Sequence, residues 1–162
     1  MVLILTLKEK IWHTDELYSL KFERPKDFDF KPGQFITINA EVDKKIERRA
    51  YSISSSPTEK DYIMFTIKKE KHVSKKLSEM EPGDKIEGRG PFGIFTLDEN
   101  AENIVFIAGG TGVTPFRCMS RYITDKKLKT KIMLFYSART ENDFLFNNEF
   151  NDIKNENFEY LP

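Results

Sequence analysis

The segment from Ile104 to Ile123 contains the strongest chemical signal in this sequence. An apolar run rich in β-branched residues, Ile104–Ala108, is typical of a strand that is buried on both faces, and glycines follow it at positions 109, 110 and 112. Thr114 and Pro115 then predict a helix start, with the threonine as N-cap and the proline at the first helical position. A strand, a glycine turn and a helix in this order place bare backbone N–H groups and the positive end of a helix dipole at one point, which suits a phosphate group.

The spacing of this turn leaves a second interpretation open. In Gly110-x-Gly112-x-x-Pro115, a proline stands where the dinucleotide-binding fingerprint has its third glycine. A tight strand-to-helix connection without any ligand shows the same pattern. On these residues alone, the two interpretations are equally supported.

Composition limits the classes of function that the rest of the chain can serve. The 162 residues include 26 basic and 26 acidic ones, so no nucleic-acid or anionic-membrane surface is expected. Cys118 is the only cysteine, and the two histidines, His13 and His72, lack metal-ligand spacing. We therefore expect no internal disulfide, no iron–sulfur cluster held by this chain and no metal site. No apolar run approaches the ~20 residues of a membrane span, the N-terminus lacks a signal-peptide pattern, and a cytoplasmic location is predicted.

Residues 1–98 have the pattern of a β-rich domain. Polar and glycine-containing turn signals, such as Lys31-Pro32-Gly33, separate short stretches of strand-forming residues. Val73, Leu77 and Met80 recur at helical spacing and predict a short amphipathic helix that closes a barrel. Six short strands with such turns fit a closed antiparallel barrel. The predicted strands are Val2–Leu5, Leu17–Phe22, Phe35–Ile38, Ala50–Ser54, Tyr62–Ile67 and Lys85–Glu87.

Residues 99–162 have a different pattern, and the polar segment Asp98–Asn103 predicts a domain boundary. Strands are expected over 104–108 and 131–136, and helices over 115–124 and 142–153. This alternation predicts a parallel sheet with crossover helices, and Phe158–Pro162 reads as the start of a third strand. Because an independent domain usually has ~100 residues or more, the second domain is predicted to be incomplete.

Several motifs, in the same order and spacing, resemble the ferredoxin–NADP reductase family. Arg49–Ser52, preceded by Pro32–Phe35 and followed by Val73–Leu77, resembles the family's flavin lobe, and Gly90–Gly93 resembles the exit from that lobe. Gly109–Pro115 is similar to the family's nicotinamide-dinucleotide turn, and Phe135–Thr140 to the end of its second parallel strand. The resemblance implies a six-stranded antiparallel Greek-key barrel that binds FAD, with FMN as the alternative, followed by a partial parallel α/β lobe for NAD(P)H.

The resemblance also implies roles for individual residues of the flavin lobe. Arg49 would pair with a flavin phosphate, for which a guanidinium fork is well suited, and Tyr51 would lie against the flavin ring. Ser52 would hydrogen-bond near the reactive flavin nitrogen, N5. The predicted flavin-binding set is Arg49, Ala50, Tyr51, Ser52, Ile67, Lys68 and the backbone of His72, Val73 and Ser74. The family often has glycine where this chain has Lys71, so a positive φ at Lys71 would be strained, unless the lysine adds a charge contact to the pyrophosphate.

On the dinucleotide side, the resemblance implies a set of turn and strand-end residues. The predicted set is Gly109, Gly110, Thr111, Gly112, Thr114, Pro115, Ser137 and Arg139. Ser52 and Thr111 would set the approach of the nicotinamide to the flavin, and they are the predicted catalytic residues. Ser137 and Arg139 lean towards NADP, because an NAD site usually ends its second strand in an acid. Arg139 as a salt-bridge partner on a solvated face stays an open alternative.

The predicted function is a flavin-dependent oxidoreductase that passes electrons between NAD(P)H and a separate acceptor by hydride transfer at flavin N5. The acceptor is expected to be a redox protein or a small molecule. The alternative is a flavin-binding electron-transfer subunit of a larger complex, without NAD(P)H activity of its own, and a third interpretation is a non-catalytic dinucleotide sensor. The family's later strands, with a Cys-Gly-Pro segment, are missing here, and Cys118 is instead expected to be a small buried helix residue.

Overall fold

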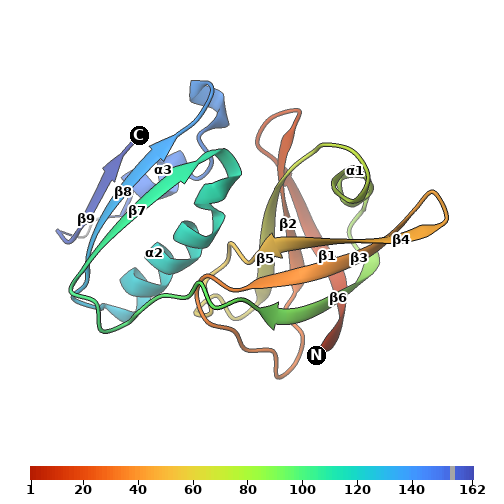
Figure 1. Ribbon diagram of the computed structural model, residues 1–162, viewed down its shortest axis with the longest axis horizontal. Coiled ribbons are helices and arrows are strands. Elements are labelled where there is room, and N and C mark those ends of the chain that lie inside the picture. Colours follow the sequence, from red (N-terminus) through yellow and green to blue (C-terminus); the bar gives the residue numbers. More distant parts are fainter. Residues whose placement is uncertain (154–155) are drawn as a thin grey trace.

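Six antiparallel strands in the N-terminal part of the chain form one curved sheet, in the order β4-β3-β6-β1-β2-β5 (Figure 1). The computed structural model describes residues 1–153 and 156–162. The predicted six-stranded antiparallel barrel is confirmed. Its strands are β1 (Val2–Trp12), β2 (Leu17–Glu23), β3 (Phe35–Val42), β4 (Lys45–Ser52), β5 (Tyr62–Lys68) and β6 (Lys85–Phe92), and the short helix α1 is Val73–Ser78.

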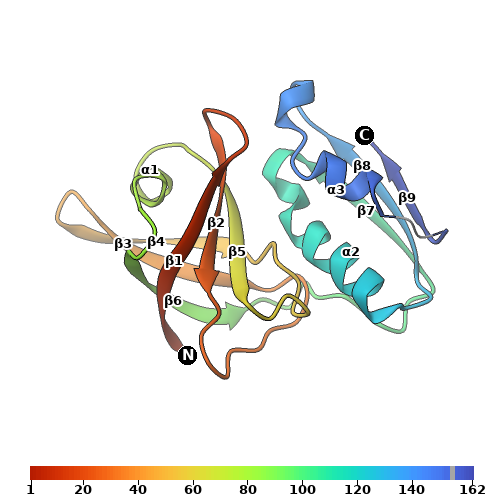
Figure 2. The same ribbon diagram turned by 180° about the vertical axis from the view of Figure 1, so that it is seen from behind.

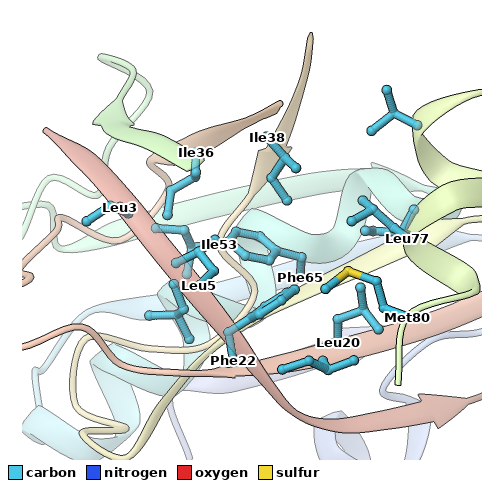
Figure 3. Close-up of a cluster of buried hydrophobic side chains, with 14 of the residues drawn as sticks. Leu3, Leu5, Leu20, Phe22, Ile36, Ile38, Ile53, Phe65, Leu77 and Met80 are labelled. Atoms are coloured by element: carbon cyan, nitrogen blue, oxygen red, sulfur yellow. The ribbon is translucent and has the colours of Figure 1, made fainter. Parts of the chain in front are cut away.

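The core of the barrel follows from alternation along the strands. In β1, Leu3, Leu5 and Leu7 are buried while Val2 and Ile4 are exposed, as the two-residue period of a strand requires. Figure 3 shows Leu3 and Leu5 in the same cluster as side chains of the facing strands, among them Phe22 and Phe65. Leu77 and Met80, from α1 and the residues just after it, fill one end of this core. The predicted short helix that closes the barrel is therefore confirmed.

The barrel's ladder is open between β4 and β5, the two edge strands of the sheet. The chain after β4 runs along β5, where the Ser54 N–H donates to the Met64 carbonyl over 2.8 Å. The Ser55 hydroxyl accepts the Met64 N–H over 2.9 Å, so side chains complete the pairing where the ladder stops. The strand predicted over 50–54 is thus found earlier in the chain, as β4, which begins at Lys45 and ends at Ser52.

The C-terminal part forms a three-stranded parallel sheet in the order β7-β8-β9, in agreement with the predicted partial α/β lobe. Its strands are β7 (Asn103–Gly109), β8 (Lys131–Ser137) and β9 (Phe158–Leu161), and its helices are α2 (Thr114–Lys126) and α3 (Asn147–Asn151). Both helices lie on the side of the sheet that faces the barrel (Figure 2). None of these helices, within residues 1–153 and 156–162, has the length and apolar character needed to cross a membrane.

Strand β7 is buried on one face only, so the prediction of burial on both faces is wrong. Phe106 and Ala108 point into the core, whereas Val105 is 59% exposed and Ile107 is 76% exposed. Phe135 of β8 is exposed beside them, at 42%. Among the described residues, both helices of this lobe cover the opposite face of the sheet, which explains the one-sided burial.

The single helix predicted over 142–153 is also wrong. A short 3-10 turn, η2 (Glu141–Asp143), is followed by the five residues of α3. Phe146 has a left-handed backbone, with φ of 61°, which interrupts a right-handed helix. The Leu145 N–H donates to the Tyr136 hydroxyl over 3.1 Å and is therefore lost to any helical ladder.

The two lobes interdigitate through α2. Cys118 of α2 is fully buried in the barrel's core cluster, whereas Met119 and Ile123 of the same helix lie in the core of the α/β lobe. In the opposite direction, Leu17 of β2 packs into the α/β core. The prediction that Cys118 is a small buried helix residue is confirmed, and its burial raises the pKa of its thiol to about 12.

We expect Gly33→Ala to destabilise the protein far more than Gly83→Ala, although both glycines have positive φ, +101° and +98°. A Cβ at Gly33 would lie 2.3 Å from the Phe95 carbonyl oxygen and 2.5 Å from Met119 Cε, whereas a Cβ at Gly83 meets nothing within 4 Å. Strained φ alone costs about 1 to 2 kcal/mol, and overpacking adds about 1 to 3 kcal/mol at Gly33. Urea unfolding of the two variants measures this difference, and equal losses of stability would contradict the close approach of the lobes at Gly33.

Candidate functional site

A cavity of about 850 Å³ opens where the ends of β4 and β5 face the start of α2. It brings together residues from four separate parts of the sequence, because antiparallel strands of the barrel and the parallel strand β7 end at the same junction. The predicted residues that line it are Arg49, Ala50, Tyr51, Ser52, Ile67, Lys68, His72, Ser74, Thr111, Gly112, Thr114 and Pro115. Val73 does not line it, since its side chain is buried in the barrel core. The sequence reasoning left out Glu16, Thr66, Lys69, Glu70 and, as a member of the set, Lys71.

A second cavity, of about 420 Å³, adjoins the first and holds the remaining predicted residues. These are Gly109, Gly110, Ser137 and Arg139, at the carboxyl ends of the parallel strands β7 and β8. Three residues, Glu16, Lys68 and Thr111, line both cavities, and the Lys68 ammonium lies 3.3 Å from the Glu16 carboxylate. A ligand in one cavity would therefore lie next to a ligand in the other.

The glycine turn leaves its backbone bare towards both cavities, with Gly110 lining the second and Gly112 lining the first. Gly110 opens the 3-10 turn η1 (Gly110–Val113) with φ of +50°, and an added Cβ at Gly110 or Gly112 would meet nothing within 4 Å. Glycine adopts such a backbone without the strain that a side chain would bring. The turn thus provides open main-chain surface at the end of β7, as the sequence predicted.

The helix start differs from the prediction in one respect. Thr114 is already helical, with φ of −56° and ψ of −47°, and the N-cap position belongs to Val113, which offers no side-chain cap. The Thr114 hydroxyl donates backwards to the Thr111 carbonyl over 3.0 Å, so it does not accept from an amide ahead. The assignment of Thr114 as N-cap is wrong because η1 has already turned the chain, and Pro115 is the second residue of the helix.

Glu47 organises the cationic wall of the first cavity. Its carboxylate accepts from His72 Nδ1 over 2.8 Å and lies 3.7 Å from the Arg49 guanidinium. Arg49 also donates to the Arg48 carbonyl over 3.0 Å, and its side chain remains 59% exposed. A carboxylate placed between two potential cations holds both of them at the cavity wall, where an anionic ligand would compete for them. Glu47 lies two residues before Arg49 and therefore on the same face of β4. This spacing is the pattern in the sequence that could have indicated the pair.

The residue with a strained backbone in this segment is His72, next to Lys71. His72 is the N-cap residue of α1, with φ of 61° and ψ of −124°, a region that side chains rarely occupy. Lys71 does not have positive φ, so the strain that such a backbone would bring does not arise there, and Lys71 lines the first cavity. Backbone strain of this kind costs about 1 to 3 kcal/mol and persists at ligand-binding sites.

Tyr51 presents a neutral ring to the first cavity. It packs in part against the barrel core. Burial raises the pKa of Tyr51 to about 12, with the Arg49 charge lowering it and the Glu70 charge raising it by smaller amounts. Beneath it, burial also raises the pKa of Tyr18, whose hydroxyl donates to the Ser74 carbonyl and so fixes the start of α1 against β2. Both phenols therefore stay protonated at neutral pH.

A buried arginine at the lobe junction was not foreseen from the sequence. Arg117 of α2 donates to the Ser54 carbonyl over 2.7 Å, to Glu59 over 3.1 Å and to Glu149 over 2.8 Å. Burial works to lower the pKa of Arg117, but the two carboxylates raise it above its ordinary value. Burial likewise works to raise the pKa of Glu59, but the Arg117 charge and hydrogen bonds from Arg117, Tyr62 and the Ser56 amide lower it overall. A lone arginine in an amphipathic helix reads as a surface residue, so no local pattern reveals this cluster.

Family models match both lobes of the chain. Residues 2–97 match the family of oxidoreductase FAD-binding domains, and residues 106–161 match the oxidoreductase NAD-binding domain. The chain is 36% identical over 135 residues to the glycine betaine monooxygenase reductase subunit of Chromohalobacter salexigens, covering 81% of this chain and 37% of that protein. It is 35% identical over 151 residues to the sulfhydrogenase 2 subunit gamma of Pyrococcus furiosus, covering 90% of this chain and 51% of that protein.

Comparison with solved structures agrees with the fold. A ferredoxin NADP⁺ reductase from Neisseria gonorrhoeae, with bound FAD and NADP, superposes with a TM-score of 0.87 at 20% identity. The match covers 99% of this chain and 67% of that structure. The chain therefore spans about a third to a half of the curated relatives it matches, and two thirds of this structural neighbour.

We expect Gly110→Val to weaken dinucleotide binding by about tenfold or more, because a branched side chain at φ of +50° strains the turn and covers its bare backbone. Titration with NADH and with NADPH measures the change in affinity. The matched control is Gly83→Val, which places the same side chain at φ of +98° and remote from both cavities. Equal dinucleotide affinity in Gly110→Val and in the parent would show that the turn does not contact the ligand.

Proposed function

Because the chain belongs to the oxidoreductase family that joins an FAD-binding domain to an NAD-binding domain, we propose that it passes electrons between NAD(P)H and a separate acceptor through a bound flavin. One observation carries the proposal: the flavin-motif residues line the first cavity, the dinucleotide turn runs from the second cavity into the first, and Lys68 and Thr111 lie in both. Two ligands in these positions would be in direct contact, as hydride transfer requires.

The residues of the first cavity fit FAD. Its volume of about 850 Å³ is in the range of natural cofactor sites, and Arg49 and Lys71 supply positive charge for phosphates. The neutral ring of Tyr51, two residues after Arg49 on β4, supplies a flat apolar surface. In the proposal, Arg49 and the backbone around His72–Ser74 hold the phosphates, and Tyr51, Ser52, Ile67 and the backbone of Lys68 border the ring and the ribityl chain.

The chain's own side chains orient the reactants. The flavin, when bound, supplies the redox chemistry, because it takes two electrons as a hydride and releases them singly. Ser52 ends β4 at the wall of the first cavity, and Thr111 lies on the border of both. We assign Ser52 and Thr111 as the catalytic pair whose hydroxyls fix the approach of nicotinamide and flavin. No general acid or base is needed for the hydride step.

The second cavity holds the residues that would choose between NADH and NADPH. The Arg139 side chain is exposed there and makes no ion pair among residues 1–153 and 156–162, so it is available for a 2′-phosphate. Asp143 lines the same cavity, and its carboxylate accepts from the Thr140 hydroxyl over 3.0 Å. The proposal therefore includes both dinucleotides, with Arg139 favouring NADPH and Asp143 favouring NADH.

A second candidate is an electron-transfer subunit that receives its electrons from another chain. The relatives support it, because one is a reductase subunit of a monooxygenase and another is the gamma subunit of a sulfhydrogenase. In either case the acceptor is a separate redox partner. We also propose a cytoplasmic location. Cys118 is a free, buried cysteine, and proteins without disulfides are usual in reducing compartments.

The purified protein, reconstituted with FAD, should show the visible absorption of an oxidised flavin. Anaerobic addition of NADH or NADPH should bleach that absorption, since the two ligands would lie in adjoining cavities. A flavin that binds but is bleached only by a redox partner would select the electron-transfer subunit. A protein that retains neither FAD nor FMN would contradict both functions.

Arg49→Ala should weaken FAD binding by about tenfold to a hundredfold, because a charge-assisted hydrogen bond contributes about 1.5 to 3 kcal/mol. Equilibrium dialysis or fluorescence titration with FAD measures the loss. The matched control is Arg48→Ala, which removes the neighbouring exposed arginine that does not line the cavity. If the two variants bind FAD equally well, Arg49 does not contact the cofactor.

A further inference from the structure

We propose that Arg117 is a positioning residue that fixes the angle between the two lobes and so keeps the two cavities open to each other. The expected effect on electron transfer rests on the proposed function. The fixed angle between the lobes rests only on the contacts at their junction. The Arg117 side chain is only 7% exposed, and the 13-residue helix α2 carries it into the junction between the lobes (Figures 1 and 2).

The partners of Arg117 come from both lobes. On the barrel side, its Nη1 donates to the Ser54 carbonyl over 2.7 Å and to the Glu59 carboxylate over 3.1 Å, and both residues lie in the loop between β4 and β5. On the α/β side, its Nε donates to the Glu149 carboxylate over 2.8 Å, and its guanidinium lies 5.2 Å from the Phe146 ring centroid. One planar group therefore joins the barrel, α2 and α3 in a single arrangement.

The geometry of a guanidinium makes this joint directional. Its donors diverge in one plane, so they can satisfy a backbone carbonyl and two carboxylates only from one orientation. Glu59 is itself held by the Ser56 amide over 2.7 Å and by the Tyr62 hydroxyl, so the barrel side of the joint is rigid. A lysine would keep the charge but could not reproduce these divergent hydrogen bonds.

The joint connects directly to the walls of the first cavity. Ser54 lies two residues after Ser52, and Arg117 lies three residues after Thr114, one turn along the same helix. A rotation of α2 relative to the barrel would move Thr111 and Thr114 away from Ser52 and would draw Cys118 out of the barrel core, so Arg117 and this packing together hold the helix. The expected effect of loosening Arg117 is therefore on the relation between the cavities, with the flavin wall of β4 and β5 left intact.

A spectroscopic distance measures the joint without relying on activity. Spin labels at Lys8→Cys on β1 and Lys131→Cys on β8 report the separation of the lobes by pulsed electron resonance, because both positions are exposed and Cys118 is fully buried. Arg117→Lys should broaden or shift the distance distribution, with FAD affinity close to that of the parent. The matched control is Arg121→Lys, on the same helix, whose exposed side chain pairs with Asp125 of that helix over 3.2 Å and should leave the distribution unchanged.

A distance distribution in Arg117→Lys identical to the parent's would overturn the proposal. If Arg117→Lys does not fold, Glu149→Gln removes one charge from the joint with little change of shape. The same broadening of the distance distribution is expected in Glu149→Gln, and a distribution identical to the parent's would refute the proposal. As a second measurement, the rate at which NADH or NADPH bleaches the bound flavin should fall about tenfold or more in Arg117→Lys. Failure of the parent itself to be bleached would count against the proposed function alone, because the distance measurement still decides the role of Arg117.

Discussion

Helix α2 must satisfy two hydrophobic cores and one buried charge at the same time, and this constraint determines where the site lies. Cys118 belongs to the barrel core, Met119 and Ile123 belong to the α/β core, and Arg117 between them is neutralised by carboxylates from both sides. A helix held in this way cannot slide or rotate without exposing apolar surface or leaving a buried ion without its partner. Because the glycine turn leads directly into α2, its position relative to the barrel is fixed by the same contacts.

The charged side chains that line the first cavity are mostly basic, although the chain as a whole has equal numbers of basic and acidic residues. Basic groups gather at the ends of β4 and β5 and at the start of α1, and Glu47 and Glu16 hold three of them at the cavity walls, namely Arg49, His72 and Lys68. These are exposed or half-exposed pairs, so each is worth little to stability. An anion with several phosphate oxygens can replace such a carboxylate at small cost, and the strained backbone of His72 persists at the same point.

The local patterns of the sequence predicted most of the secondary structure because those segments depend on near neighbours. Alternation along β1 and the spacing of Val73, Leu77 and Met80 each describe one face of one element packing on one core. The prediction failed where a contact from elsewhere decided the outcome. The Tyr136 hydroxyl takes the Leu145 amide, so the helix expected over 142–153 is replaced by a turn and a short helix. The apolar run of β7 suggested two buried faces, whereas the described helices cover only one.

The sequence by itself determined the order of the elements, the antiparallel and parallel character of the two sheets, and the residue types offered to a flavin and a dinucleotide. These follow from hydrophobic periodicity, glycine and proline chemistry, and motif order, all of which are local along the chain. Only the tertiary structure decided that Thr111 and Lys68 are shared by two cavities, that Glu47 holds Arg49 and His72, and that Arg117 is buried between the lobes. The physical reason is that burial and ion pairing depend on distances between residues far apart in the chain, and those distances exist only once the barrel and the parallel sheet have packed on the two sides of α2.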